Sequence, residues 1–123
     1  MLYNAKYTQS VIASDHGNQA VVSIADTWLK RLLGFKSKVA SGGVDGVLIH
    51  PCSSIHTFGM QFDIDVYFLS EELRVIRSYP LLRSGRCRFV RGAKYVLELK
   101  SGKMPFPFAS AGDYLTLAQY NRC

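Results

Sequence analysis

The segment Val47–Leu69, VLIHPCSSIHTFGMQFDIDVYFL, decides how this 123-residue chain folds. Two strongly apolar runs, GVLI at Gly46–Ile49 and DVYFL at Asp65–Leu69, enclose a stretch that carries most of the reactive side-chain types of the chain. Short apolar runs rich in β-branched and aromatic residues are typical of buried strands. The segment is therefore predicted to be a strand–loop–strand unit that either forms a site or contributes several satisfied polar groups to a core.

Further strands are predicted on both sides of this unit. They are Gln19–Ala25 (QAVVSIA), Arg74–Tyr79 (RVIRSY), Tyr95–Leu99 (YVLEL) and Tyr114–Ala118 (YLTLA). The turn at SEEL makes Arg74–Tyr79 the second arm of a hairpin, and Pro80 is expected to end that arm. The two prolines of MPFPF exclude a helix there and favour an extended loop.

One short helix of about two turns is predicted after the strand Gln19–Ala25 and before the strand Gly46–Ile49. Asp26 or Thr27 offers an N-cap oxygen, and Gly34 stands in the C′ position. The apolar residues at helical spacing are Trp28, Leu29, Leu32 and Leu33. We expect this apolar face to pack on the core.

These elements predict a single β-rich α+β domain over residues 1–123, with residues 1–18 as an N-terminal extension or a first strand. Antiparallel strands need their edges closed, so the expected architecture is a small barrel or a rolled, mostly antiparallel sheet with one short helix.

The composition describes a folded, basic chain. The net charge is +6, the pI is near 9.4, and 48% of the residues are hydrophobic. Such a charge permits contact with anions, including nucleic acid, but specifies no partner. The sequence has no signal-peptide pattern and no apolar run long enough to cross a bilayer. Cys52, Cys87 and Cys123 form no CxxC pair, so free thiols and a cytoplasmic location are expected.

Several ordered blocks then resemble one family. ADTWLKRLLGF (Ala25–Phe35), HTFGMQFDIDVYFL (His56–Leu69) and GAKYVLELKSG (Gly92–Gly102) are similar to the bacterial and archaeal family called "domain of unknown function 192". The resemblance runs from about residue 20 to 117. It implies a compact β-rich α+β domain and no established activity. The chain departs from the family pattern at Asp63, where proline is common, and at MPFPFASAGDY, which replaces a short helix.

The reactive residues of the Val47–Leu69 unit support three hypotheses. His50, Cys52 and His56 carry atoms that bind zinc, but the spacing H-x-C-x3-H matches no zinc motif, so neither a metal nor a cofactor is predicted. Cys52 and His56 could instead form a thiolate–imidazolium pair, with Asp65 as the orienting carboxylate of a small hydrolase. Asp65 could also be structural, because a buried carboxylate must be hydrogen-bonded or paired.

Two features favour binding over catalysis. Phe58, Met60 and Phe62 alternate, and such a surface packs a core or lines a peptide or ligand groove. The arginine-rich segment, Arg83–Lys94, suggests alternation, with Arg86 and Arg88 outward and Phe89 inward. Arginine forms paired hydrogen bonds with phosphate or carboxylate groups, so the segment could bind anions. Alternatively, the arginines could belong to a solvated edge strand.

The sequence therefore predicts an uncharacterised binding or accessory module. Its expected ligand-binding residues are His56, Phe58, Met60, Asp65, Arg86 and Arg88, and an anionic ligand or a peptide would suit them. The alternatives are a small hydrolase or metal-dependent enzyme centred on His56, Asp65 and Cys52, and a nucleic-acid-binding protein.

Overall fold

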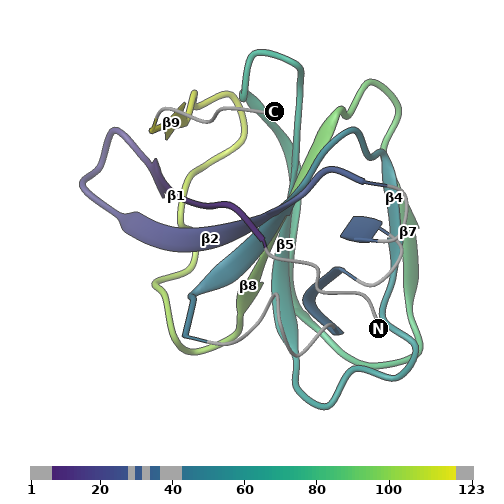
Figure 1. Cartoon of the computed structure of the whole chain (residues 1–123). Coiled ribbons are helices and arrows are strands. Elements are labelled where there is room, and N and C mark those ends of the chain that lie inside the picture. Colours follow the sequence, from purple (N-terminus) through teal and green to yellow (C-terminus); the bar gives the residue numbers. More distant parts are fainter. Residues whose placement is uncertain (1–6, 28–29, 32–33, 37–42, 119–123) are drawn as a thin grey trace.

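The structure is a computed structural model, and it describes residues 7–27, 30–31, 34–36 and 43–118. Within these ranges the regular secondary structure is almost entirely β-strand (Figure 1). The elements in chain order are β1 (Gln9–Ala13), β2 (Gln19–Ala25), the 3-10 turn η1 (Gly34–Lys36), β3 (Gly46–Ile49), β4 (Ser54–His56), β5 (Ile64–Leu69), β6 (Val75–Leu82), β7 (Cys87–Phe89), β8 (Tyr95–Lys100) and β9 (Thr116–Leu117).

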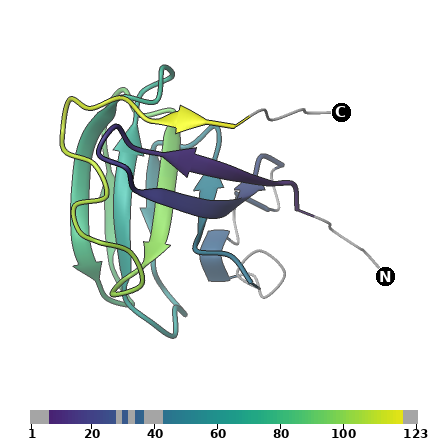
Figure 2. The same ribbon diagram turned by 90° about the vertical axis from the view of Figure 1, so that its left-hand side faces the viewer.

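Seven strands form one sheet in the order β6-β5-β8-β3-β2-β1-β9, and β4 pairs with β7 in a separate two-stranded ribbon. Every neighbouring pair is antiparallel except β2 and β3, which run parallel. The large sheet curls into a half-barrel, so that β1, β2 and β9 run across the direction of β5 and β8 (Figures 1 and 2). The predicted rolled, mostly antiparallel sheet is confirmed.

The helical part of the prediction is confirmed only in part. The Thr27 hydroxyl accepts a hydrogen bond from the Lys30 N–H at 3.3 Å, and the Thr27 carbonyl accepts one from the Arg31 N–H at 2.9 Å. This is the pattern of an N-cap, and it places the predicted cap at Thr27. Trp28, Leu29, Leu32 and Leu33 lie outside the described residues. Across the described ranges, no helix is both long and apolar enough to span a membrane.

Both faces of the large sheet are covered by other parts of the chain, and one apolar cluster lies against each face. Along β5, Ile64, Val66 and Phe68 point into one cluster, whereas Tyr67 and Leu69 point into the other. Every residue of β5 is buried, as expected for a strand with both faces covered.

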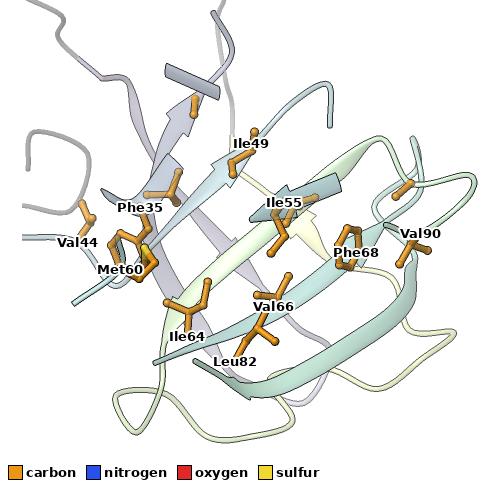
Figure 3. Packing of buried hydrophobic residues seen from close by; sticks show 14 residues of the cluster. Phe35, Val44, Ile49, Ile55, Met60, Ile64, Val66, Phe68, Leu82 and Val90 are labelled. Carbon is orange, nitrogen blue, oxygen red and sulfur yellow. The ribbon is translucent and has the colours of Figure 1, made fainter. Parts of the chain in front are cut away.

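The two coverings differ in construction. The first cluster is closed by the β4–β7 ribbon, through Ile55 and Val90, and by Phe35 of η1 (Figure 3). We call this the ribbon side. The second cluster is closed by the long segment 104–115, through Phe108 and Leu115. We call this the loop side.

The end of β6 departs from the prediction. Pro80 does not end the strand, which continues to Leu82, because β6 is an edge strand and its outer edge tolerates a residue without an N–H. The register shifts by one residue opposite Asp65, and Leu81 adopts a positive φ of 50°. The Leu81 N–H then donates to Asp65 Oδ1 at 2.9 Å, so the carboxylate holds the bulge.

Three strands were not predicted as such. β1 occupies residues 9–13, within the region for which the sequence left an N-terminal extension or a first strand open. β4 and β7 have three residues each, which is too short to give a recognisable alternation in sequence. Their pairing joins residues more than thirty positions apart, with Ile55 opposite Arg88.

Candidate functional site

A cavity of about 500 Å³ opens on the ribbon side, between the sheet and the segment 51–56. Its wall combines apolar residues of the first cluster with about as much polar surface. The lining residues with reactive or soft side chains are Arg31, Cys52, His56, Met60, Lys94 and Glu98. Pockets of this size that combine apolar walls with polar groups are candidate small-molecule sites.

Glu98 is the least expected of these residues. It lies in the middle of β8, opposite Val47 of β3 and Val66 of β5, and its residue is only 4% exposed. An ionised carboxylate among valines is costly unless donors reach it. The Phe35 N–H provides one such hydrogen bond, to Glu98 Oε1 at 3.1 Å.

The chain passes close to this carboxylate because residue 34 is glycine. Gly34 has a φ of +53°, as the predicted C′ position requires, and a Cβ there would lie 3.2 Å from Glu98 Oε1. Sequence reasoning missed Glu98, although a signal was present. In YVLEL, Glu98 is the single acidic residue, and it lies between two leucines.

Arg31 brings a positive charge to the same cavity. Its Nη1 donates to the Pro51 carbonyl at 3.1 Å, which ties the start of the cavity-lining segment to the region after β2. Its Nε is buried and has no hydrogen-bond partner among the described residues. A buried, unpaired guanidinium N–H is costly, so this donor is well placed to bind an acceptor atom of a ligand.

Cys52 lines the cavity as a thiol. Burial raises the pKa of Cys52, and the negative charge of Glu98 raises the pKa further. Its Sγ lies 3.0 Å from the Ser54 carbonyl, as a donor. The thiol is therefore protonated at neutral pH, whereas a nucleophilic cysteine needs a lowered pKa. Within the described residues both Cys52 and Cys87 are free, and Cys123 lies outside them.

The structure separates the residues of the predicted hydrolase centre. Cys52 and His56 both border the cavity, although alternation in β4 turns the His56 side chain away from buried Ile55. Asp65 points to the loop side, where its Oδ1 accepts hydrogen bonds from the Leu81 N–H and, at 2.8 Å, from the Ser101 hydroxyl. Asp65 is 4% exposed and does not line the cavity. His56 and Asp65 therefore do not share a cleft.

His50 is also directed away from the cavity. Its ring stacks on Tyr95, with centroids 4.0 Å apart, and its Nε2 lies 3.7 Å from Glu71 Oε1. In the part of the chain that the structure describes, no three His, Cys, Asp or Glu side chains are grouped as metal ligands would be. The three residues weighed as zinc ligands are thus divided between two places.

The arginine-rich segment is arranged differently from the prediction. Phe89 was expected to face inward, but it is 65% exposed. Arg88 lies opposite buried Ile55, is only partly exposed, and places its guanidinium 5.0 Å from the centre of the Tyr79 ring. Because β7 covers the sheet with its Arg88 side, its neighbours Cys87 and Phe89 point outward.

The remaining predicted ligand-binding residues fall in two places. Met60 is buried in the first cluster and lines the cavity. Phe58 is 54% exposed, and its ring centroid lies 5.6 Å from that of His56. Arg86 is exposed, and its N–H donates to the Thr57 hydroxyl at 2.8 Å.

Residues 11–117 match the model of a family named DUF192, described as "Uncharacterized ACR". The chain belongs to the DUF192 family. The match confirms the resemblance seen in the sequence blocks, and it begins earlier than residue 20, so that it includes most of β1. Glu98 lies within one of those blocks, GAKYVLELKSG. No curated protein matches this DUF192 chain.

Solved structures share the fold at low sequence identity. A Sinorhizobium meliloti 1021 protein, described as a "putative transcription regulator", has a TM-score of 0.74 and 16% identity, covering 94% of this chain and 98% of that one. A Novosphingobium aromaticivorans DSM 12444 protein of unknown function has a TM-score of 0.65 and 16% identity, covering 89% and 84%. A hypothetical protein from Synechocystis has a TM-score of 0.58 and 14% identity, covering 89% and 18%.

Proposed function

We propose that this DUF192 protein is a small binding module whose ligand occupies the ribbon-side cavity. The observation that carries the proposal is the Glu98 carboxylate, which is almost completely buried and yet lines a cavity of about 500 Å³. Asp65, the other buried carboxylate, accepts its hydrogen bonds on the loop side and does not line the cavity.

The charges around the cavity indicate the chemistry of the ligand. Arg31 and Lys94 are positive and Glu98 is negative, so the lining suits a molecule that combines an acceptor or anionic group with a hydrogen-bond donor. The buried Arg31 Nε supplies a donor for the first group, and Glu98 supplies an acceptor for the second. Met60 and Ile55 offer apolar contact to the body of the ligand. Amino acids and hydroxy acids have this combination.

The hydrolase alternative has less support. Its nucleophile would be Cys52, whose pKa is raised, and its orienting carboxylate would be Asp65, which lies on the opposite side of the sheet from His56. The nucleic-acid alternative concerns a different surface, the outside of the β4–β7 ribbon. The description of the Sinorhizobium meliloti protein agrees with that alternative, but at 16% identity the likeness carries the fold alone.

A thermal-shift panel tests the proposal. The panel contains amino acids, hydroxy acids and, for each, the parent carboxylic acid that lacks the amino or hydroxyl group. We expect stabilisation by a member with both groups, and little by its parent acid, because only the former carries an amino or hydroxyl donor that can reach the Glu98 carboxylate at the cavity wall. Glu98→Gln should abolish the stabilisation, whereas Asp65→Asn, a matched change on the loop side, should keep it. Equal stabilisation of the parent protein and Glu98→Gln would contradict the assignment of Glu98.

A further inference from the structure

The outside of the β4–β7 ribbon presents aromatic rings to solvent. We call this surface the outer ribbon face and define it by His56, Phe58, Cys87 and Phe89. In the ribbon register His56 lies opposite Cys87, and Ser54 lies opposite Phe89, so these side chains share the face that points away from Ile55 and the core. Phe58 and Phe89 are 54% and 65% exposed. Large rings left in solvent at this level, gathered on one face, mark an interaction surface.

The segment that contains β7 is rich in cations that have no acidic partner among the described residues. Residues 77–94 contain five arginines and one lysine, Arg77, Arg83, Arg86, Arg88, Arg91 and Lys94, and no aspartate or glutamate. None of these six makes an ion pair with another described residue. Arg83, Arg86 and Arg91 are exposed. A basic border without compensating carboxylates attracts a polyanion.

Hydrogen bonds fix the backbone of Arg83 and Arg86 next to the residue before Phe58. The Thr57 hydroxyl accepts the Arg86 N–H at 2.8 Å and donates to the Arg83 carbonyl, while the Gly85 N–H donates to the Thr57 carbonyl at 3.3 Å. Thr57 is fully buried and directly precedes Phe58. The turn that carries Arg83 and Arg86 is therefore fixed against the residue that precedes an exposed ring. The fold therefore places the backbone of Arg83 and Arg86 next to the residue that precedes Phe58.

From this juxtaposition we propose that the outer ribbon face binds single-stranded nucleic acid. Bases stack on Phe58 and Phe89, and Arg83, Arg86 and Arg91 bind the phosphates along the strand. Aromatic stacking combined with a basic border is the general mode of sequence-tolerant single-strand binding. A duplex is a poorer fit, because its bases are already stacked on one another and offer these rings no free face.

Two other partners fit the surface less well. Membrane-interface surfaces favour tryptophan and tyrosine and do not discriminate between lysine and arginine, whereas this face has phenylalanine and mainly arginine. The carboxylates of an acidic peptide would bind the arginines, but such a peptide offers no planar group to stack on the two phenylalanine rings. Arginine, by contrast, both forks onto phosphate and stacks on rings.

Fluorescence anisotropy with labelled oligo-deoxythymidine and oligo-uridine of about 16 nucleotides tests the proposal, since one such surface occupies at most that length. Titrations run between about 50 and 200 mM salt. Phe58→Ala combined with Phe89→Ala should weaken binding about tenfold or more and leave the salt slope unchanged. Arg83→Gln combined with Arg86→Gln should weaken binding and lower the slope by about 0.7 for each phosphate that the variant no longer binds.

The matched control is Arg74→Gln combined with Tyr114→Ala. These two residues also form an exposed arginine–aromatic pair, bridged to each other between the start of β6 and the segment 111–115, and Tyr114 is 54% exposed. The control should bind as the parent protein does. All three variants should melt with the parent, because the changed side chains are exposed.

Several results would overturn the proposal. They are an absence of oligonucleotide binding by the parent protein, unchanged binding by the double phenylalanine variant, and equal binding of a duplex of the same length. Poly-glutamate or anionic vesicles that bind in an arginine-dependent way, while the oligonucleotides do not, would assign the face to those partners instead. None of these results depends on Glu98 or on the cavity.

Discussion

The two faces of the large sheet each carry one buried carboxylate, and the surroundings of the two carboxylates differ. Asp65 of β5 faces the loop side, where a backbone N–H and a hydroxyl both reach its Oδ1. Glu98 of β8 faces the ribbon side, where it receives the Phe35 N–H and also lines a cavity. Burial alone therefore does not distinguish the two acidic side chains. They differ in what lies beside them on their face of the sheet, which is hydrogen-bond donors for Asp65 and a cavity for Glu98.

The largest expected effect is on stability, because side chains should be packed more tightly on the loop side than beside the cavity on the ribbon side. Phe108 is fully buried on the loop side, so Phe108→Ala should lower the free energy of unfolding by about 3–5 kcal/mol. Met60 borders the cavity on the ribbon side, so Met60→Ala should cost about 2 kcal/mol, the low end for such truncations. Urea denaturation measures both. Equal losses would mean that the ribbon side is packed as tightly as the loop side.

Asp65 gives the next largest effect. Asp65→Asn should lower the free energy of unfolding by about 1–3 kcal/mol, because it removes the charge from two hydrogen bonds that hold the β6 bulge and Ser101. Thermal melts at neutral pH measure the change. A variant as stable as the parent would remove the structural role assigned to Asp65 and with it the contrast between the faces.

The loop side should also respond to high pH through Tyr67. Burial raises the pKa of Tyr67 to about 12, and its hydroxyl accepts the Phe108 N–H at 2.8 Å. A tyrosine in the unfolded chain ionises near pH 10, so the contribution of Tyr67 to stability is complete below about pH 10 and is lost as the pH rises to about 12.

Two measurements check this pH dependence. Absorbance titration of phenolate should show one tyrosine fewer ionising near pH 10 in the native protein than after unfolding. Tyr67→Phe should lose less stability than the parent between pH 10 and 12. The same loss in both proteins would place the alkaline sensitivity elsewhere.

Glu98 gives the smallest expected change in stability. Glu98→Gln keeps an oxygen for the Phe35 N–H and removes a buried charge, so the free energy of unfolding should fall less than in Asp65→Asn or rise, as often follows replacement of a site residue. Parallel urea curves for Glu98→Gln and Asp65→Asn show the difference directly. A loss in Glu98→Gln as large as in Asp65→Asn would make Glu98 a structural carboxylate too.

Much of the sheet was predictable from the sequence. Gln19–Ala25 and Gly46–Ile49 are strands with the predicted bounds, and the hairpin of β5 and β6 was read from two apolar runs around a turn. The Thr27 cap and the turn at Gly34 follow from local chemistry. These features depend on the preferences of neighbouring residues, which a sequence displays directly.

The candidate site was predicted only in part. Cys52, His56 and Met60 were singled out and line the cavity, but Glu98 was not, and Asp65 lies on the other face. Alternation along a strand places Glu98 on the side of β8 opposite to Leu97 and Leu99. It does not say which side faces a cavity, because that depends on how residues 51–56 cross the sheet.

The sequence by itself determined most strands of the large sheet, a helix cap at Asp26 or Thr27 and the basic segment, since each rests on local residue preferences. Tertiary structure decided the parallel pairing of β2 with β3, the β4–β7 ribbon and the direction of Phe89. In a three-residue strand, either orientation satisfies the same alternation. Packing of the Arg88 side against Ile55 and Tyr79, residues distant in the chain, selects the orientation that leaves Phe89 in solvent.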